Sequence, residues 1–295
     1  MKQKAILLLC LIGLLVLTGC GKKQTAAEVE EPLPVKQVSS VLYRNGTTTL
    51  RFICNKDKWV WADGEEFPLD DSTIQEILAR LPGITSTEPE KDTADLAACG
   101  LAEPTRYLTV GSDEGERTIC FGKQAANGMW YMRPVESDNV YLIPDDFVQL
   151  LEKDIYDMAI LPVLPELREE SMTFIGVSRG EDNTYLLHAD GAWKSNGRDV
   201  AATARKILKE LDGITLTRCV DYFPAVGVSD LCGLTEGATR ITLKYTNSVG
   251  SESELLLTVG TLMESGEGYF ITVGESEAIY CLPQHQLNTL LSLLE

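Results

Sequence analysis

The chain has 295 residues, a length that allows one large domain or two of ordinary size at about 150 residues each. Hydrophobic residues make up 44% and charged residues 24%, which is typical of a globular protein and excludes a wholly disordered chain. Asp and Glu number 44 against 26 Lys and Arg, so the formal net charge is −18. This acidity argues against a nucleic-acid partner, because such a partner needs a basic groove.

The first twenty residues carry the pattern of an export signal. Two lysines precede an apolar run over residues 5–17, which is too short to span about 30 Å of hydrocarbon as a helix. A charged start and an apolar core of this length are typical of a secretory signal peptide. The run ends in Leu17-Thr18-Gly19-Cys20, which resembles the bacterial lipobox. This resemblance implies cleavage before Cys20 and lipidation of its thiol. An ordinary cleaved signal and an uncleaved anchor are the alternatives.

We therefore expect residues 1–19 to be a lipoprotein signal peptide and residues 20–37 to be the lipidated cysteine with a flexible tether. The tether is charged and proline-containing, and it has no apolar periodicity. Two or three acyl chains such as palmitate bury enough CH₂ groups, at about 0.8 kcal/mol each, for a stable anchor. The acidic body should stand away from anionic lipid. The expected location is the extracytoplasmic side of the cell membrane, in the cell envelope.

The rest of the chain contains an internal repeat, which predicts two tandem related copies at residues 38–158 and 172–295 with a linker at 159–171. In the clearest match, Leu81-Pro82-Gly83-Ile84-Thr85 recurs as Leu211-Asp212-Gly213-Ile214-Thr215. Further matches pair Asp95-Leu96 with Asp230-Leu231, Cys99-Gly100-Leu101 with Cys232-Gly233-Leu234, Thr105-Arg106 with Thr239-Arg240, Phe121-Gly122 with Val259-Gly260, Tyr131 with Tyr269, and Val140-Tyr141 with Ile279-Tyr280.

The elements expected within each copy follow from turn chemistry and periodicity. Asn45-Gly46 predicts a hairpin, and an extended segment with Trp59 and Trp61, or Trp193 in the second copy, comes next. Helices are expected to begin near Asp70 and Asp199, with an acidic first turn. Strands then follow at 107–110, 118–121, 129–133 and 140–143, with a second hairpin at Asn127-Gly128, and closing helices at about Asp145–Met158 and His285–Leu294. This order predicts an α+β fold in which each copy is a mostly antiparallel sheet with helices packed on one side.

With these features the chain resembles a bacterial family, the domain of unknown function numbered 4340. The residues that carry the resemblance are the Trp59 segment, Leu81-Pro82-Gly83, Asp95-Leu96, Gly100-Leu101, Pro104, Phe121-Gly122, Tyr131 and Val140-Tyr141. Cys99 and Cys232 stand where the family often has an aromatic residue. The resemblance implies a lipoprotein or membrane-anchored protein that accompanies ABC-type export or gliding-type transporter components, and it implies no catalytic residues.

Two patterns could suggest a hydrolase. Gly176-Val177-Ser178-Arg179-Gly180 matches the G-x-S-x-G nucleophile elbow, but a turn and a second strand follow it, so we expect a structural hairpin turn. His188 and His285 are the two histidines of the chain, which limits catalytic triads and His-based metal sites. We interpret both as surface or capping residues.

The sequence patterns for metal sites and disulfides are as weak as those for a hydrolase. Besides Cys20, six cysteines remain in the processed chain, without C-x-x-C spacing, and their fifteen possible pairings cannot be ranked. We expect them to be buried free thiols: Cys54, Cys99, Cys120, Cys219, Cys232 and Cys281. Acidic pairs could in principle hold Ca²⁺, and exposed aromatic residues could stack on a sugar. We interpret the acidic pairs (Glu65-Glu66, Asp70-Asp71, Asp145-Asp146 and Glu169-Glu170) as solvated faces and helix starts, and the aromatic residues (Trp59, Trp61, Trp130 and Tyr131) as core and cross-strand packing.

These observations predict a non-enzymatic surface lipoprotein without cofactor or metal, which binds a membrane transporter component or an envelope polymer through its two lobes. The alternative is a solute-binding lipoprotein that uses the groove between the lobes. A hydrolase is a third hypothesis, and it would need acid or serine chemistry without an evident histidine partner.

Overall fold

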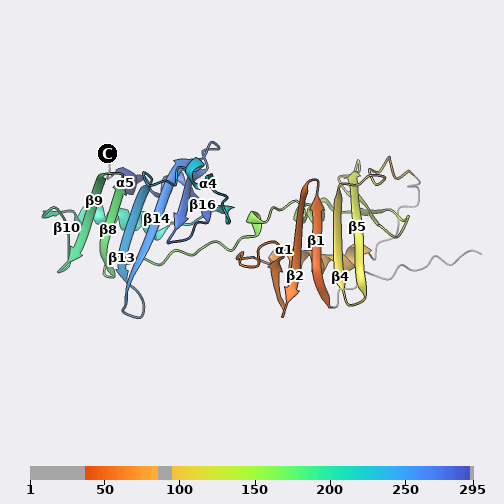
Figure 1. Ribbon diagram of the computed structural model, residues 1–295, viewed down its shortest axis with the longest axis horizontal. Coiled ribbons are helices and arrows are strands. Elements are labelled where there is room, and N and C mark those ends of the chain that lie inside the picture. The colour runs from red at the N-terminus through yellow and green to blue at the C-terminus, as the bar shows by residue number, and fades with distance from the viewer. Residues whose placement is uncertain (1–36, 86–94, 293–295) are drawn as a thin grey trace, which may run out of the picture. The chain divides into compact units, whose positions relative to one another are not determined.

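The computed structural model describes residues 37–85 and 95–292 (Figure 1). The predicted signal peptide, Cys20 and the tether up to residue 36 lie outside the described residues. Within the described ranges, each helix is too short or too polar to cross a membrane.

The first sheet has seven strands, and every neighbouring pair is antiparallel (Figure 1). Its spatial order is β3-β2-β1-β4-β5-β6-β7. The strands are β1 (Val38–Asn45), β2 (Thr48–Asn55), β3 (Lys58–Trp61), β4 (Arg106–Ser112), β5 (Gly115–Gln124), β6 (Trp130–Pro134) and β7 (Tyr141–Ile143).

Both predicted hairpin turns of this half are confirmed. Asn45 pairs with Thr48 across the first turn, where Gly46 has a φ of 60°. In the second turn, the backbone N–H of Ala125 donates to the carbonyl of Met129 at 2.6 Å, and Gly128 has a φ of 84°. Positive φ angles suit glycine because it has no Cβ to clash with the backbone.

Two helices belong to the first half, namely α1 (Ser72–Thr85) and α2 (Asp145–Leu150), and a short 3₁₀ turn, η1 (Tyr156–Met158), follows. The expected helix from Asp145 to Met158 is therefore wrong in its length. Helix α2 closes with bonds of the 3₁₀ type, from Leu151 N–H to Val148 O at 2.9 Å and from Glu152 N–H to Gln149 O at 3.2 Å. Beyond it, the side chains of Asp157 and Asp154 accept from the backbone N–H groups of Asp154 at 2.9 Å and Tyr156 at 3.1 Å, which favours the separate turn η1 over a continued helix. Such side-chain bonds compete with the helical backbone ladder.

The second sheet has nine strands in the order β11-β10-β9-β8-β13-β14-β15-β16-β12, again antiparallel throughout. Apart from the edge strands β11 and β12, its order of elements is that of the first sheet. The strands are β8 (Met172–Arg179), β9 (Asp182–Ala189), β10 (Ala192–Ser195), β11 (Arg198–Asp199), β12 (Arg218–Asp221), β13 (Thr239–Thr246), β14 (Glu252–Leu262), β15 (Gly268–Val273) and β16 (Ile279–Pro283).

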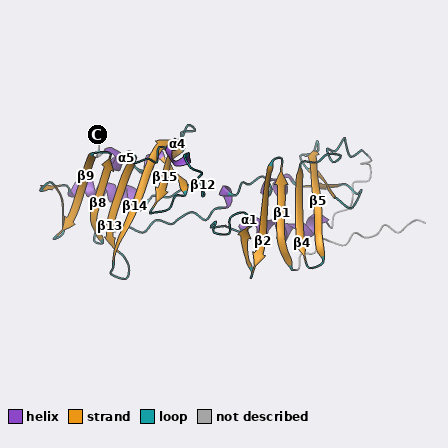
Figure 2. Ribbon diagram, in the orientation of Figure 1, coloured by secondary structure: helices purple, strands orange, loops and turns teal. Residues whose placement is uncertain are grey.

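The helices of the second half are α3 (Ala201–Asp212), α4 (Val228–Leu231) and α5 (Asn288–Leu291), with a 3₁₀ turn η2 (Gln284–Gln286) before α5. The expected closing helix from His285 is wrong in its start, because His285 lies in η2 and Leu287 has a φ of −124°, which interrupts helical geometry. Figure 2 shows the helices of each half behind the strands, so each half is an α+β unit with a mostly antiparallel sheet.

Each half has its own hydrophobic core. In the first, Ile74, Ile77 and Leu81 of α1 pack in one cluster with inward residues of the sheet such as Phe52. In the second, Ile207 of α3 and Trp193 of β10 belong to a separate cluster. The alternation of buried and exposed residues along the strands thus places one sheet face under the helices.

Asp70 and Asp199 do not lie in the first turns of α1 and α3, so the expected acidic first turns are wrong. They precede the helices, and each carboxylate accepts from a backbone N–H two residues on: Asp70 from Ser72 at 3.0 Å and Asp199 from Ala201 at 2.9 Å. Both side chains satisfy a donor that the first helical turn leaves without an intrahelical partner.

We expect Asp70→Ala to lower the free energy of unfolding by about 0.5–2 kcal/mol at neutral pH. Asp70→Asn should keep most of the stability that this side chain contributes, because the amide oxygen can accept the same hydrogen bond. The hydrogen bond from the Ser72 backbone lowers the pKa of Asp70. The contribution of this carboxylate is therefore present above its unfolded pKa of about 4 and is lost as the pH falls through the lower folded value. Urea unfolding at pH 7 and pH 2.5 measures this, and an equal cost of Asp70→Ala at both pH values contradicts it.

Candidate functional site

A turn before β4 and its counterpart before β13 each dock a backbone carbonyl on the sheet. The N–H of Lys123 donates to Cys99 O at 2.9 Å, and that of Thr261 donates to Cys232 O at 2.9 Å. A Cβ on the preceding glycine, Gly122 or Gly260, would clash with that carbonyl, so these positions require glycine.

The docked turns have the hydrogen bonds of a Schellman motif. In the first turn, Leu101 N–H donates to Leu96 O at 2.7 Å and Gly100 N–H donates to Ala97 O at 3.1 Å. In the second turn, Leu234 N–H donates to Ser229 O at 2.9 Å and Gly233 N–H donates to Asp230 O at 3.0 Å. Leu96 therefore has the place of Ser229. The expected match of Asp95-Leu96 with Asp230-Leu231 is wrong by two residues.

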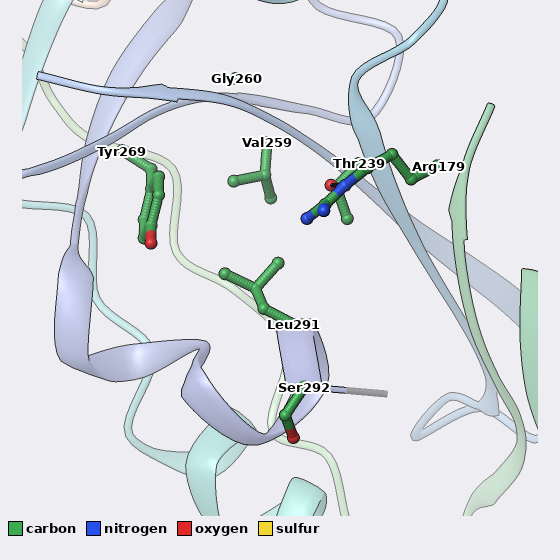
Figure 3. Close-up of a pocket in the computed structure, with 7 residues that line it drawn as sticks. All are labelled: Arg179, Thr239, Val259, Gly260, Tyr269, Leu291 and Ser292. Atoms are coloured by element: carbon green, nitrogen blue, oxygen red, sulfur yellow. Dashed lines mark hydrogen bonds between the residues drawn. The ribbon is translucent and has the colours of Figure 1, made fainter. Parts of the chain in front are cut away.

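In the second half, Gly260 forms one wall of a cavity of about 360 Å³ (Figure 3). The cavity lies where the ends of β8, β13, β14 and β15 meet the last helix, α5. Its lining residues are Arg179, Thr239, Val259, Gly260, Tyr269, Leu291 and Ser292.

Arg179 supplies the charge of this cavity. Its Nε donates to the hydroxyl of Thr239 at 2.8 Å, and Thr239 is buried. Figure 3 shows the guanidinium group directed toward the space between Val259 and Leu291, with the ring of Tyr269 on the far side. Across the described ranges of the chain, no carboxylate forms an ion pair with Arg179.

The strand registers identify the same place in the first sheet. Phe121 lies opposite Arg106 as Val259 lies opposite Thr239. Trp130 lies opposite Ile143 as Tyr269 lies opposite Leu282. Thus Trp130 rather than Tyr131 corresponds to Tyr269, and Arg106 corresponds to Thr239, so two of the expected matches are offset by one residue.

At that place the first sheet has a different cation, Arg106 in the position of Thr239, and this cation is paired and covered. The guanidinium of Arg106 lies 4.9 Å from the ring centroid of Trp130 and 3.6 Å from a carboxylate oxygen of Glu152. The indole Nε1 of Trp130 donates to Asp145 at 2.7 Å. The first sheet therefore fills with its own side chains the space that is open in the second.

Two other hollows have cations that are paired with acids. One of about 520 Å³ includes Arg168, which pairs with Glu166 at 2.9 Å. Another of about 350 Å³ includes Arg80, which pairs with Asp146 at 2.7 Å. Among these hollows, the cavity at Arg179 is the one in which a cation remains available to a ligand.

The G-x-S-x-G segment forms the end of β8 and the turn to β9, so the expected hairpin is confirmed. His188 contacts the carbonyl of Met172 through Nδ1 at 2.8 Å and stacks on Trp193 with ring centroids 4.7 Å apart. His285 lies in η2. In the described part of the chain, neither histidine is hydrogen-bonded to Ser178.

The six cysteines at residues 54–281 are free thiols, as expected. Five are buried, and Cys54 is half-buried. Burial raises the pKa of the Cys99, Cys120 and Cys232 thiols, and it raises that of Cys219, next to the charge of Asp221, to about 11. These thiols are therefore poor nucleophiles.

We expect iodoacetamide at pH 8 to alkylate Cys54 in the native protein, and to alkylate the other five thiols only after denaturation. Burial blocks access to all five thiols, and the raised pKa values of Cys99, Cys120, Cys219 and Cys232 keep these four protonated. Peptide mapping by mass spectrometry measures this site by site. Native labelling of Cys219 at the rate of Cys54, or thiols that need a reductant before they react, would contradict the expectation.

Three of the four acidic pairs have structural contacts. Asp146 pairs with Arg80, and Glu169 pairs with Arg205 at 3.2 Å. The described residues contain no group of three or more His, Cys, Asp or Glu side chains placed to hold a metal ion. Trp59 and Trp61 of β3 belong to the first core, Trp59 as a buried member and Trp61 as a partly buried neighbour, in agreement with the packing interpretation.

Comparison with known protein families gives one match, to the domain of unknown function DUF4340, over residues 59–236. The chain belongs to this family. The matched region begins in β3 and ends between α4 and β13, so it includes strands of both sheets. No curated protein and no solved structure matches the chain.

The sequence patterns around Arg179 and Tyr269 indicate no binding role for either residue. Arg179 belongs to the G-x-S-x-G segment, in which Ser178 is the candidate nucleophile, and Tyr269 belongs to the internal repeat. The signal in the sequence that could have indicated a binding site is the position of Arg179 at a strand end beside a hairpin turn. Its partners, however, come from strands sixty and ninety residues further along the chain.

Proposed function

We propose that this DUF4340 protein is a lipoprotein of the extracytoplasmic membrane surface that acts as a non-enzymatic binding or scaffold protein. The observation that carries the proposal is the tetrapeptide Leu17-Thr18-Gly19-Cys20 directly after a charged and apolar leader. The described body begins at residue 37, which leaves a charged, proline-containing segment between the lipid and the first strand. Such a segment suits a tether.

The non-enzymatic part of the proposal draws on the contacts of the reactive side chains. Ser178 lies in a β-hairpin strand, His188 is held by a backbone carbonyl and an indole ring, and burial raises the pKa of four thiols. Each of these groups has a structural role that accounts for its position.

We also infer that the two halves are tandem related copies, with boundaries at residues 38–158 and 172–295 and a linker at 159–171. The shared strand order and the two Schellman turns, each docked on a glycine, support this inference. Two similar lobes on one tether offer two related surfaces to a partner.

Metabolic labelling tests the anchor. In bacteria fed radiolabelled palmitate, we expect the parent chain to carry label and to sediment with membranes, and Cys20→Ala to lose the label. Cys54→Ala is the matched control, because it removes a half-buried thiol of β2 and should keep both the label and the membrane fraction. A labelled Cys20→Ala chain would show that the lipobox interpretation is wrong.

The proposed partner is a membrane component of an ABC-type transporter, with an envelope polymer as the other candidate. Affinity purification from detergent-solubilised membranes after cross-linking should recover a transporter permease with the parent chain, and much less of it with unanchored Cys20→Ala. Reproducible failure to recover any membrane protein counts against a transporter partner. The alternative of a solute bound between the lobes stays a prediction, which ligand-dependent thermal shifts would support.

A further inference from the structure

We propose that the cavity of the second half binds a small carboxylate ligand with a short apolar tail, with its carboxylate on Arg179. The proposal goes beyond the lipoprotein function and does not depend on the anchor, since all of its residues lie in the second sheet and α5.

The first argument is charge. Among the described residues, Arg80, Arg106, Arg168, Arg205 and Arg218 each have an acidic partner within 4 Å, whereas Arg179 belongs to the arginines without one. Arg179 instead bonds to a neutral hydroxyl, that of Thr239. Because Arg179 is exposed, an anion from solution can reach its guanidinium group.

The second argument is geometry. Because Nε is bonded to Thr239, the plane of the guanidinium group is held and its two terminal nitrogens remain available. These two nitrogens present parallel N–H donors, which match the two oxygens of a carboxylate. The hydrogen bond to Thr239 thus orients the donors before a ligand arrives, which lowers the entropic cost of binding.

The third argument is the presence of apolar side chains beside the guanidinium group. Val259 and Leu291 flank the guanidinium group, and the ring of Tyr269 faces it (Figure 3). The volume of about 360 Å³ is at the small end of ligand pockets, which commonly measure about 300–1,000 Å³. A single cation matches the single charge of a monocarboxylate better than the double charge of a phosphate, and a short tail would contact Leu291 and the ring of Tyr269.

The fourth argument is the comparison with the first sheet. There, Phe121 and Trp130 occupy the places of Val259 and Tyr269, and Glu152 is close to the cation. The second half thus has smaller side chains at both places and lacks the acidic partner, so that the same location is open and cationic.

The test uses the full chain in detergent micelles and 4-methylpentanoate as the probe, with binding measured by saturation-transfer difference NMR and calorimetry. The neutral amide of the same acid has nearly the same shape and no charge. We expect the acid to bind saturably and at least about tenfold more tightly than the amide, since a charge-assisted bond replaces a neutral one.

Two variants separate the charge from the cavity. Arg179→Gln should weaken binding of the acid about tenfold or more, whereas Arg240→Gln should change it less than about twofold. Arg240 is the matched control, because it removes the same charge from the next position of β13, on the exposed side of the strand. Val259→Phe should also abolish binding, by introducing the residue found at the equivalent place in the first sheet.

Three results would overturn the proposal: equal binding of acid and amide, unchanged binding by Arg179→Gln, or tighter binding of inorganic phosphate than of the acid. The last would identify a phosphate site instead. Circular dichroism of each variant establishes that it is folded. If Val259→Phe does not fold, the comparison of Arg179→Gln with Arg240→Gln still decides the outcome.

Discussion

Trp193→Ala is expected to lower the free energy of unfolding by about 3–5 kcal/mol, the range for removing a large buried aromatic side chain. Trp193 is 1% exposed in β10, and its carbonyl accepts the backbone N–H of Val200 at 3.0 Å, at the start of α3. Its ring packs in the core of the second half and stacks on His188. Loss of the ring leaves a cavity between sheet and helix that the rigid strands cannot close.

Urea unfolding followed by circular dichroism measures this loss, and thermal unfolding should show a fall of roughly 6–20 °C, at about 2–4 °C per kcal/mol. Two control variants are compared with Trp193→Ala. Leu187→Ala, at a 46% exposed position of β9, should stay within about 0.5 kcal/mol. Trp193→Phe keeps most of the ring and removes an indole nitrogen that is buried without a partner, so it should cost much less than Trp193→Ala. A cost below 1 kcal/mol for Trp193→Ala would contradict the packing described above.

Gly122→Ala is expected to lower the free energy of unfolding by about 2–4 kcal/mol, from overpacking together with a lost backbone hydrogen bond. The new Cβ would clash with the carbonyl of Cys99, which accepts from Lys123, and would approach Leu101 to 3.0 Å. Backbone atoms cannot rotate away as a side chain can. The turn must therefore leave the sheet, and we expect Cys99, now 3% exposed, to become reactive.

Equilibrium unfolding and the rate of iodoacetamide labelling at Cys99 measure the two effects together. Gly83→Ala is the matched control, because no atom lies within 4 Å of its added Cβ and the position is helical. Alanine there should be neutral or stabilising by up to about 1 kcal/mol. If both substitutions gave the same stability and left Cys99 protected, the docked turn would not contribute to the fold.

Local chemistry explains which elements were predictable. Asn45-Gly46 and Asn127-Gly128 determine hairpins because glycine tolerates the positive φ of the turn, and alternation then places residues such as Phe52 and Phe121 on one sheet face. The closing helices were harder to predict. In the region after Asp145, apolar spacing indicates a long helix, yet α2 ends at Leu150, and the side chains of Asp154 and Asp157 bond to the backbone of a separate turn, η1.

Residue matching between the halves was predictable only approximately. A shift by one residue reverses the face of a strand, and sequence similarity alone preferred Tyr131 over Trp130 as the counterpart of Tyr269. The strand pairing decides for Trp130, because Ile143 and Leu282 hold the same place in their strands. Register is a property of paired strands, so it becomes visible only when both partners are placed.

The sequence by itself determined the family resemblance, the antiparallel hairpins, the globular acidic character and the expected anchor at Cys20, because each of these depends on composition or on residues close together in the chain. Only the tertiary structure decided the cavity at Arg179. Its walls come from Arg179, Thr239, Val259, Tyr269 and Leu291, which lie on four strands and a helix spread over more than a hundred residues. Long-range strand pairing brings these side chains together, and no local pattern records it.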